Sequence, residues 1–382
     1  MKIGVLTYHR AINYGAFLQA YALCQKLDLE PGIDAELIDF QMNKEVSHYN
    51  IGLSRLTLRH PIIWFHNKVN EGKQKQLFEI AMQRQKLSSE RVISDSIEDF
   101  ISAFRGKYDA IIVGSDEVWK TDGFRGFPTP YWLFGDLGCA KLSYAVSART
   151  QFNILPMHQQ EMLANALKDF DYIGVRDVLT QQEVKKYCSK AQTVHLCCDP
   201  TFLIDFNPNK ENGLKILKER FGVDVEKQII GIMTEKRIIS KRIKTLMKTS
   251  KFEIISLYEF LPGCINASLL SPFEWIDVVA CLSLIITSYF HAVCFATKLG
   301  VPLIAFGTAN KATKVEEVLV RINRENNYYS NIEDLVSTGK IKEIIEYKVD
   351  TDPAVFIPDE NLLDGYYGLV KCLRERFILN YS

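Results

Sequence analysis

A serine, a tyrosine and a histidine stand together where a buried strand is expected to turn into a helix. Residues 282–287 are apolar and β-branched, which is typical of a strand covered on both faces in a parallel sheet. Thr287 and Ser288 can cap the helix that follows. Open α/β sheets bind ligands at the carboxyl ends of their strands, and free amides at a helix start attract anions. Ser288, Tyr289 and His291 are therefore candidate contacts for an anionic substrate, although a histidine here could also merely satisfy a turn.

A tight turn, Asn13-Tyr14-Gly15, joins an expected strand at 2–8 to an expected helix at 16–27. Glycine in such a turn lets the backbone come close to whatever occupies the edge of the sheet. The same spacing also fits a plain connection between a strand and a helix. Both interpretations of the turn stay open on the sequence alone.

A carboxylate follows the next central strand, because residues 108–113 lead into Gly114-Ser115-Asp116. A carboxylate just past the carboxyl end of a strand can hold a sugar hydroxyl or act as a base. It can equally cap the turn that follows. The loop 121–138 then carries aromatic rings that could stack on a sugar or fill a core. These rings are Phe124, Phe127, Tyr131, Trp132 and Phe134.

A single arginine, Arg176, ends an expected strand at 172–175. Its planar guanidinium suits two-point binding of a carboxylate or a phosphate, so it is a candidate anion clamp. It could instead pair with Asp177 or with a neighbouring helix, as lone arginines usually do.

The composition excludes several classes of protein. The 382 residues are 47% hydrophobic, and 46 basic residues balance 46 acidic ones, so no overall basic field favours a nucleic acid partner. The N-terminus lacks the features of a secretion signal, and no apolar run approaches ~18 residues, which predicts a cytoplasmic protein. The nine cysteines lack paired C-x-x-C spacing, so we expect no metal site and reduced thiols.

Expected strands alternate with expected helices along the whole chain. This alternation predicts an α/β protein of two Rossmann-like, doubly wound domains that face a cleft. The polar segment after residue 205 divides the chain into domains 1–205 and 206–382, and the last helix is expected to cross back to the first domain. Residues 43–105 form a helical insertion in the first domain. Its part 55–93 is basic and aromatic, and lies on a membrane surface, closes over an acceptor or packs on the sheet.

Taken in order, these motifs resemble the polysaccharide pyruvyl transferase family. The matching segments are Asn13-Tyr14-Gly15-Ala16 with Leu18-Gln19-Ala20-Tyr21-Ala22-Leu23, Tyr108-Asp109 with Gly114-Ser115-Asp116-Glu117-Val118-Trp119, Ser143-Tyr144-Ala145, Gly174-Val175-Arg176, Asp199-Pro200-Thr201, and Ser288 to His291 ahead of Gly300-Val301-Pro302. The resemblance implies a fold similar to the GT-B glycosyltransferases. It also implies transfer of a pyruvyl group from phosphoenolpyruvate to a lipid-linked, nucleotide-linked or polymeric sugar, with phosphoenolpyruvate as co-substrate and no further cofactor, in the cytoplasm or at the inner face of the membrane.

The resemblance also distributes roles over the candidate residues. It places His291 at the position of the family's catalytic histidine and Arg176 at that of a donor-binding arginine. The backbone at Ser288, Tyr289 and Phe290 would help to hold the donor on the second domain. Asp116 would serve the acceptor as ligand or base, and Asn13, Tyr14, Gly15, Gly114 and Ser115 would line the acceptor side.

One position departs from the family pattern, because relatives have an arginine two residues before the histidine and this chain has Tyr289. A phenol can donate one hydrogen bond but supplies no charge. Either another cation replaces the arginine, or the donor is not phosphoenolpyruvate. The candidate cations are Arg149, Lys236, Arg237 and Lys311. The alternative functions are a glycosyltransferase that uses a nucleotide sugar and a non-catalytic binding module in polysaccharide assembly.

Overall fold

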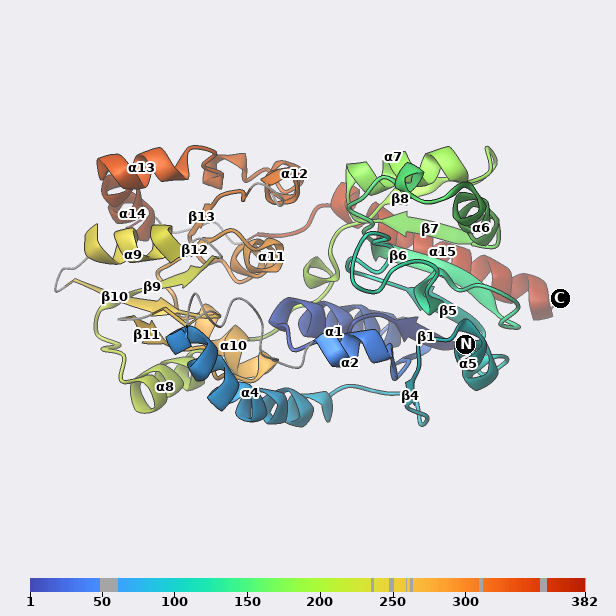
Figure 1. Ribbon diagram of the computed structural model, residues 1–382, viewed down its shortest axis with the longest axis horizontal. Helices are drawn as coiled ribbons and strands as arrows, with labels where there is room; N and C mark the ends of the chain where they lie inside the picture. The colour runs from blue at the N-terminus through green and yellow to red at the C-terminus, as the bar shows by residue number, and fades with distance from the viewer. Residues whose placement is uncertain are drawn as a thin grey trace. The chain divides into compact units, whose positions relative to one another are not determined.

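The computed structural model describes residues 1–48, 61–234, 237–246, 251–258, 260–261, 264–308, 312–350 and 356–381. The chain forms two compact units, each built around its own sheet (Figure 1). Unit 1 contains Met1–Asn50, Gln83–Ile204 and Asp359–Ser382, and unit 2 contains Ile51–Met82 and Asp205–Pro358.

Unit 1 has a six-stranded parallel sheet in the order β2-β1-β5-β6-β7-β8. Its strands are β1 (Lys2–Leu6), β2 (Asp34–Leu37), β5 (Ala110–Val113), β6 (Ala140–Val146), β7 (Tyr172–Val175) and β8 (Val194–Leu196). Its helices are α1 (Tyr14–Asp28), α2 (Asn43–His48), α5 (Ile97–Phe104), α6 (Met157–Lys168), α7 (Val178–Tyr187) and α15 (Glu360–Tyr381). The short strands β3 (Phe40–Gln41) and β4 (Val92–Ile93) form a separate parallel pair.

Both faces of this sheet are covered by apolar cores. Along β5, Ile111 and Val113 belong to one core, whereas Ala110 and Ile112 belong to the other. Successive side chains of a strand point to opposite faces, and both faces of this sheet are covered, so all four residues are buried. A strand buried on both faces reads as a continuous apolar run, which is why the sequence predicts it.

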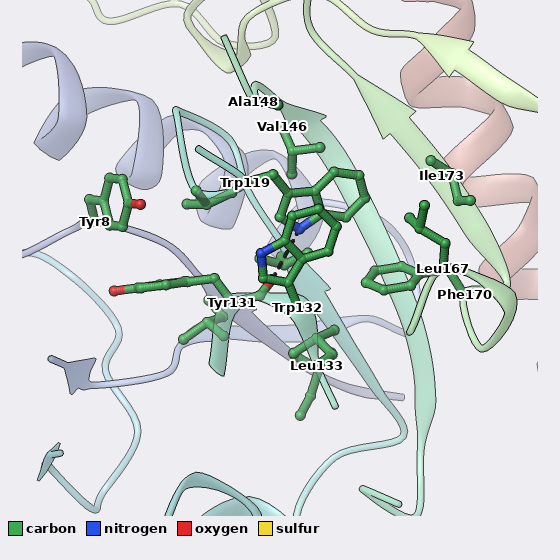
Figure 2. Packing of buried hydrophobic residues seen from close by; sticks show 14 of the residues in the cluster. Tyr8, Trp119, Tyr131, Trp132, Leu133, Val146, Ala148, Leu167, Phe170 and Ile173 are labelled. Carbon is green, nitrogen blue, oxygen red and sulfur yellow. Dashed lines mark hydrogen bonds between the residues drawn. The ribbon is translucent and has the colours of Figure 1, made fainter. Parts of the chain in front are cut away.

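Aromatic rings of the loop after β5 fill the first of these cores (Figure 2). The rings of Trp119 and Trp132 stack with centroids 4.7 Å apart, and Trp119 Nε1 donates a hydrogen bond to the carbonyl of Tyr131. Phe127 and Phe134 pack against the same core. Of the two interpretations of the loop 121–138, packing in the core therefore holds for these rings. Phe124 differs, since 40% of it is exposed.

The last helix belongs to unit 1 and covers the second core. In Figure 1, α15 runs along β6 and β7, in red. The hydroxyl of Tyr172 donates a hydrogen bond of 2.6 Å to the carbonyl of Gly365. Tyr366 of α15 is buried in the core that also holds Ile3 and Val5 of β1. The helix that follows unit 2 in sequence thus completes the first unit.

Unit 2 has a five-stranded parallel sheet in the order β11-β10-β9-β12-β13. Its strands are β9 (Gln228–Met233), β10 (Phe252–Ser256), β11 (Ile265–Asn266), β12 (Leu284–Thr287) and β13 (Leu303–Ala305). Its helices are α4 (Pro61–Met82), α8 (Lys210–Phe221), α9 (Arg237–Leu246), α10 (Pro272–Val279), α11 (Phe290–Lys298), α12 (Ala312–Arg321), α13 (Ile332–Thr338) and α14 (Ile341–Val349).

The expected helical insertion at 43–105 does not stay together. Residues 51–82 belong to unit 2, whereas the rest of the insertion belongs to unit 1. Helix α4 lies against α10, and Gln74 Nε2 donates a hydrogen bond of 3.3 Å to the carbonyl of Leu270. Phe65 and Val69 of α4 are exposed. None of the helices in the described ranges is both long and apolar enough to span a membrane.

The predicted fold class, α/β with doubly wound parallel sheets, is confirmed. In unit 1 the chain passes from β1 to β2 on one side and then to β5 on the other. In unit 2 it passes from β9 to β10 on one side and to β12 on the other. Each sheet therefore has a point where the direction of winding reverses, and such points are where α/β sheets bind ligands.

Candidate active site

A hydrogen-bonded pair of residues joins the two strand ends at each reversal point. In unit 1, Thr7 Oγ1 donates to the carbonyl of Ser115, across 2.8 Å between the ends of β1 and β5. In unit 2, the hydroxyls of Thr234 and Ser288 are 2.9 Å apart, between the ends of β9 and β12. All four residues are buried. These bonds fix the starts of the loops that carry the candidate side chains.

Ser115 is part of the interior of unit 1. Its Oγ donates a hydrogen bond of 2.6 Å to Oε1 of Gln19, and Gln19 Nε2 donates in turn to Thr7 Oγ1 at 3.1 Å. Ser115, Gln19 and Thr7 are all fully buried. We predicted that Ser115 lines the acceptor side. Its contacts instead fit a side chain that positions the loop after β5. Sequence reasoning missed Thr7, and it named Gln19 only as part of a family motif. A glutamine on the apolar face of a helix was the signal that could have assigned Gln19 a role.

The turn Asn13-Tyr14-Gly15 acts as the start of α1. Asn13 Oδ1 accepts a hydrogen bond of 3.1 Å from the amide of Ala16, which is an N-cap. Tyr14 and Gly15 are buried. Of the two interpretations of this turn, the contact of Asn13 favours the plain connection between a strand and a helix, in which Asn13 caps α1.

Gly114 meets a packing requirement of the sheet itself. Its φ is +117°, and a Cβ at this position would lie 2.1 Å from the carbonyl oxygen of Tyr144 in β6. A side chain cannot be accommodated there without moving backbone. The glycine thus lets the loop after β5 turn closely over the neighbouring strand.

Asp116 is the candidate whose carboxylate stays at the edge of unit 1. Its side chain is 15% exposed, and its φ of 86° is uncommon for a residue other than glycine. Oδ1 accepts a hydrogen bond of 2.8 Å from the amide of the next residue, Glu117, so the carboxylate also helps to hold the start of the turn that follows. Its backbone carbonyl accepts from the amide of Ser147. Strained backbone of this kind concentrates at functional sites.

Arg176 lies between two carboxylates. Nη1 donates a hydrogen bond of 3.0 Å to Oδ2 of Asp199, and Nη2 lies 3.5 Å from Oδ1 of Asp116. Burial lowers the pKa of the guanidinium, but the carboxylates of Asp116 and Asp199 outweigh burial and hold the pKa above its usual range. Asp177 does not pair with Arg176 in this way, since its Oδ1 caps α7 by accepting from the amide of Thr180.

The loop after β12 has a different capping arrangement from the predicted one. Thr287 Oγ1 donates to the carbonyl of Met233 at 2.7 Å and accepts from the amide of Tyr289 at 3.0 Å. Helix α11 begins at Phe290, so that Tyr289 is the N-cap residue and contributes no side-chain cap. The prediction that Thr287 and Ser288 cap the helix was wrong, because both hydroxyls bind residues at the end of β9.

The first turn of α11 presents a group of half-buried rings. Tyr289, Phe290 and His291 are all partly exposed, whereas the residues from Ala292 to Thr297 are buried. The ring of Tyr289 meets the ring of Tyr258 edge-on at 5.6 Å. The rings of Phe290 and His291 meet edge-on at 5.3 Å. His291 therefore lies at the carboxyl edge of the sheet, at the reversal point, rather than in the core.

The four cations considered as replacements for an arginine at position 289 are distributed as follows. Arg149 belongs to unit 1, where Nη1 donates to Oε1 of Glu117 at 3.2 Å. Arg237 begins α9, after β9 of unit 2. Lys236 and Lys311 lie outside the described residues.

A further polar cluster, missed by sequence reasoning, lies at the end of β1. Asp39 accepts hydrogen bonds from Arg10, with Nε 2.5 Å from Oδ1 and Nη2 2.7 Å from Oδ2. Nε2 of the buried His9 lies 3.3 Å from the same Oδ1. No group of three His, Cys, Asp or Glu residues suited to a metal ion occurs among the described residues.

Two doubly wound parallel units with polar loops at their reversal points define the class of α/β proteins with a GT-B-type fold, as predicted. Similar solved structures include UDP-GlcNAc 2-epimerase from Methanocaldococcus jannaschii, with a TM-score of 0.52, 12% identity and coverage of 100% of both chains. The S. aureus MnaA-UDP structure has a TM-score of 0.52 and 11% identity, and covers 100% of this chain and 97% of that chain. A putative UDP-N-acetylglucosamine 2-epimerase from Listeria monocytogenes has a TM-score of 0.50 and 11% identity, and covers 98% and 97%. At these identities the likeness concerns the fold alone.

The chain belongs to the polysaccharide pyruvyl transferase family, whose sequence profile matches residues 13–310. The resemblance inferred from the motifs is thereby confirmed. Membership in this family implies a transferase that acts on a sugar or polysaccharide acceptor. A comparison with curated protein sequences finds no significant match.

Proposed function

We propose that this protein transfers a pyruvyl group from phosphoenolpyruvate to a sugar of a cell-surface or exopolysaccharide precursor and forms a pyruvate ketal. The family match over residues 13–310 carries the proposal. The position of His291 in the first turn of α11, half-buried at the reversal point of the sheet, supports it. A histidine there can meet a ligand at the edge where α/β sheets bind them.

The reaction requires a proton donor. Protonation of the methylene carbon of phosphoenolpyruvate makes C2 cationic, and a first sugar hydroxyl attacks C2 and loses its proton. Phosphate then leaves with the C2–O bond electrons, and a second hydroxyl closes the ketal and loses its proton. Of the two hydroxyl protons, one replaces the proton given to carbon and the other leaves with phosphate. We assign the first step to His291, since an imidazole can carry a proton near neutral pH.

The donor carries a carboxylate and a phosphate, and unit 2 offers groups suited to anions. The amides of Ser288 and Tyr289 already donate to the carbonyl of Met233 and to Thr287 Oγ1, so we assign the donor to the first turn of α11, which begins at Phe290 and carries no acidic residue. Amides at a helix start attract negative charge. They would also stabilise charge on the leaving phosphate. We therefore place the donor on unit 2.

Asp116 of unit 1 is the proposed ligand or base for the acceptor hydroxyl. Its carboxylate is partly exposed, and its Oδ1 is oriented by the amide of Glu117 and by Arg176. The guanidinium of Arg176 is 3% exposed and engaged by Asp116 and Asp199. These contacts favour a positioning role for Arg176, in which it holds Asp116, over direct contact with the donor.

The proposal is tested with the purified protein and two donors. Phosphoenolpyruvate should raise the melting temperature, and phosphate should be released only when a sugar acceptor is added, for instance from a panel of p-nitrophenyl glycosides. The main alternative is an enzyme that uses a nucleotide sugar, which the UDP-bound neighbour of the same fold brings into consideration. Stabilisation by UDP-GlcNAc but not by phosphoenolpyruvate would establish that alternative. Stabilisation by neither would favour a non-catalytic binding module.

A further inference from the structure

We infer that Ser147, the residue after β6, binds a second hydroxyl of the sugar acceptor beside Asp116. The inference rests on the proposed function and deepens it, because it adds an acceptor-binding side chain. It concerns unit 1 alone, where both residues belong. The reaction supplies the reason for a second contact, since a ketal takes up two hydroxyls of one sugar and Asp116 is assigned to only one of them.

Hydrogen bonds of the backbone hold Ser147 between the ends of β5 and β7. Its amide donates to the carbonyl of Asp116 at 2.8 Å, and its carbonyl accepts from the amide of Trp119 at 3.3 Å. On the other side, the amide of Arg176 donates to the carbonyl of Val146 at 2.9 Å. In the order of the sheet, Ser147 therefore lies between the strand end that carries Asp116 and the strand end that carries Arg176.

The side chain of Ser147 points to the same face of the sheet as that of Arg176. Val146 and Ala148, on either side of Ser147, belong to the core shown in Figure 2. Successive side chains along a strand alternate between faces, so Ser147 points away from that core. Val175 belongs to the same core and pairs with Val146, so Arg176 points away from it as well. The hydroxyl of Ser147 thus lies on the face where the guanidinium of Arg176 engages its carboxylates.

The hydroxyl of Ser147 differs from that of Ser143 in its partners. Both serines are fully buried. Oγ of Ser143 accepts from the amide of Gly174 at 3.0 Å and donates to its carbonyl at 3.3 Å, whereas no group within the described part of the chain binds Oγ of Ser147. Buried polar groups are normally hydrogen-bonded, and an apolar side chain at this position would avoid the cost. A residue that breaks this rule next to a candidate site is expected where a ligand supplies the partner.

A ligand oxygen reaches this hydroxyl past Asp116, whose side chain is 15% exposed at the edge of the unit. Oδ1 of Asp116 lies 3.5 Å from Nη2 of Arg176, which is longer than is usual for a hydrogen bond, whereas Nη1 lies 3.0 Å from Asp199. The outer contact of the guanidinium is therefore the weaker one. A sugar oxygen that separates Asp116 from Arg176 enters the face on which Ser147 lies. A serine can both donate to and accept from a sugar hydroxyl, which suits a neutral acceptor group.

The test compares Ser147→Ala and Ser143→Ala with the wild-type protein. Ser147→Ala removes the hydroxyl assigned to the acceptor, and Ser143→Ala removes an equally buried hydroxyl whose partners lie in the protein. Steady-state kinetics give kcat and the KM values for phosphoenolpyruvate and for the p-nitrophenyl glycoside that the acceptor panel selects. Urea denaturation gives the stability of each variant, and circular dichroism checks its folding.

We expect Ser147→Ala to raise KM for the glycoside about 3- to 10-fold, the range for losing a neutral hydrogen bond, with KM for phosphoenolpyruvate within twofold. Its midpoint of urea denaturation should equal or exceed that of wild type, because it removes a buried hydroxyl whose partner comes from the acceptor. Ser143→Ala should show the reverse. Its midpoint should fall, because the amide of Gly174 loses the hydroxyl that it binds, and both KM values should stay within twofold.

Two deoxy forms of the same glycoside, each without one of the hydroxyls that enter the ketal, test the assignment to a single hydroxyl. Neither form can be a substrate, but both can inhibit the enzyme. The form without the hydroxyl that Ser147 binds should inhibit wild type and Ser147→Ala equally. The other form keeps that hydroxyl, so its inhibition constant should rise about 3- to 10-fold in Ser147→Ala.

Two sets of results would overturn the inference, and they differ. Suppose that the wild type transfers the pyruvyl group, and that Ser147→Ala keeps KM for the glycoside within twofold, responds alike to both deoxy forms, or is destabilised as much as Ser143→Ala. Ser147 then does not bind the acceptor, and the proposed function stands. If the wild type binds UDP-GlcNAc and shows neither binding nor turnover of phosphoenolpyruvate, the proposed function fails, and this assignment fails with it.

Discussion

Nη1 of Arg176 lies 3.0 Å from Oδ2 of Asp199, and both side chains are almost completely withdrawn from solvent. Oδ1 of Asp199 is itself held by the amide and the hydroxyl of Thr201. Asp116, which lies on the other side of the guanidinium at 3.5 Å, is the more exposed of its two carboxylate partners. Arg176 therefore connects a buried anchor to a carboxylate at the edge of unit 1.

Removal of one partner from this buried pair should destabilise the protein. Arg176→Ala leaves the carboxylate of Asp199 buried without its cation, so we expect the free energy of unfolding to fall by about 3–5 kcal/mol. Arg176→Lys should have a smaller effect, since it keeps the charge and loses the planar fork. Urea denaturation of the three proteins measures this. Wild-type stability of Arg176→Ala together with a raised KM for phosphoenolpyruvate would instead assign Arg176 to the donor.

His291 should affect turnover and leave stability nearly unchanged. A positioned proton donor contributes about 10²–10⁴-fold, so His291→Gln is expected to lower kcat by that factor. The ring is half-buried, so that the melting temperature should change little. His158→Gln on α6 is the control, because His158 is an exposed histidine outside the site. Turnover of His291→Gln within threefold of wild type would exclude the role of acid.

The cluster around Asp39 predicts a pH-dependent stability. Burial raises the pKa of Asp39, but hydrogen bonds from Arg10 and His9 outweigh burial and hold the pKa well below its usual range. A carboxyl whose pKa is depressed in the folded state stabilises the protein above its unfolded pKa of about 4, and this stabilisation is lost as the pH falls further. Asp39→Asn should therefore be less stable than wild type at pH 7, by about 1–3 kcal/mol.

The difference between Asp39→Asn and wild type should shrink as the pH falls below about 4. Urea denaturation at pH 7, 5 and 3 measures the difference. Asp136→Asn is the control, because Asp136 also has a lowered pKa but is exposed and pairs with Arg105 at the surface. Its stability should stay close to that of wild type at all three pH values, because exposed ion pairs contribute little. A gap for Asp39→Asn that widened towards pH 3 would contradict the sign of the shift.

The sequence predicts the two sheets well because buried parallel strands leave a local signal. Residues 110–113 and 284–287 are apolar runs and are buried throughout. The surface against which a helix packs leaves no such signal in the sequence. Helix α4 has the same composition whether it packs on the first sheet or on α10, and only contacts such as Gln74 with Leu270 assign it to unit 2.

The same limit applies to the candidate site. A serine after a strand looks like a ligand-binding residue until its partner is known, and the partner of Ser115 is Gln19, 96 residues away. Asp116 and His291 were predictable as residues at strand ends. The pairing of Arg176 with Asp199 was not predictable, because no spacing in the sequence relates an arginine after β7 to a carboxylate after β8.

Two glycines on helices give a matched test of the packing of α15. A Cβ at Gly365 would lie 2.6 Å from Cys197 Sγ and 2.9 Å from its Cα, so Gly365→Ala should force α15 away from β8 and cost about 1–3 kcal/mol. At Gly72 in α4 a Cβ meets nothing within 4 Å, so Gly72→Ala should stabilise the protein by up to about 1 kcal/mol. Differential scanning calorimetry compares them. A neutral Gly365→Ala would mean that α15 does not pack on β8 this closely.

Phe124 is the exposed ring through which we expect unit 1 to contact the sugar acceptor. It stacks on His48 with centroids 3.9 Å apart, and Arg125 connects it to Tyr8, whose hydroxyl binds the carbonyl of Glu117 next to Asp116. Phe124→Ala should raise KM for the acceptor about 2- to 10-fold, as for loss of an aromatic contact, and leave KM for phosphoenolpyruvate unchanged. Tyr367→Ala, at a comparably exposed ring on α15, should change neither. Equal acceptor KM values for both variants would show that the acceptor does not touch Phe124.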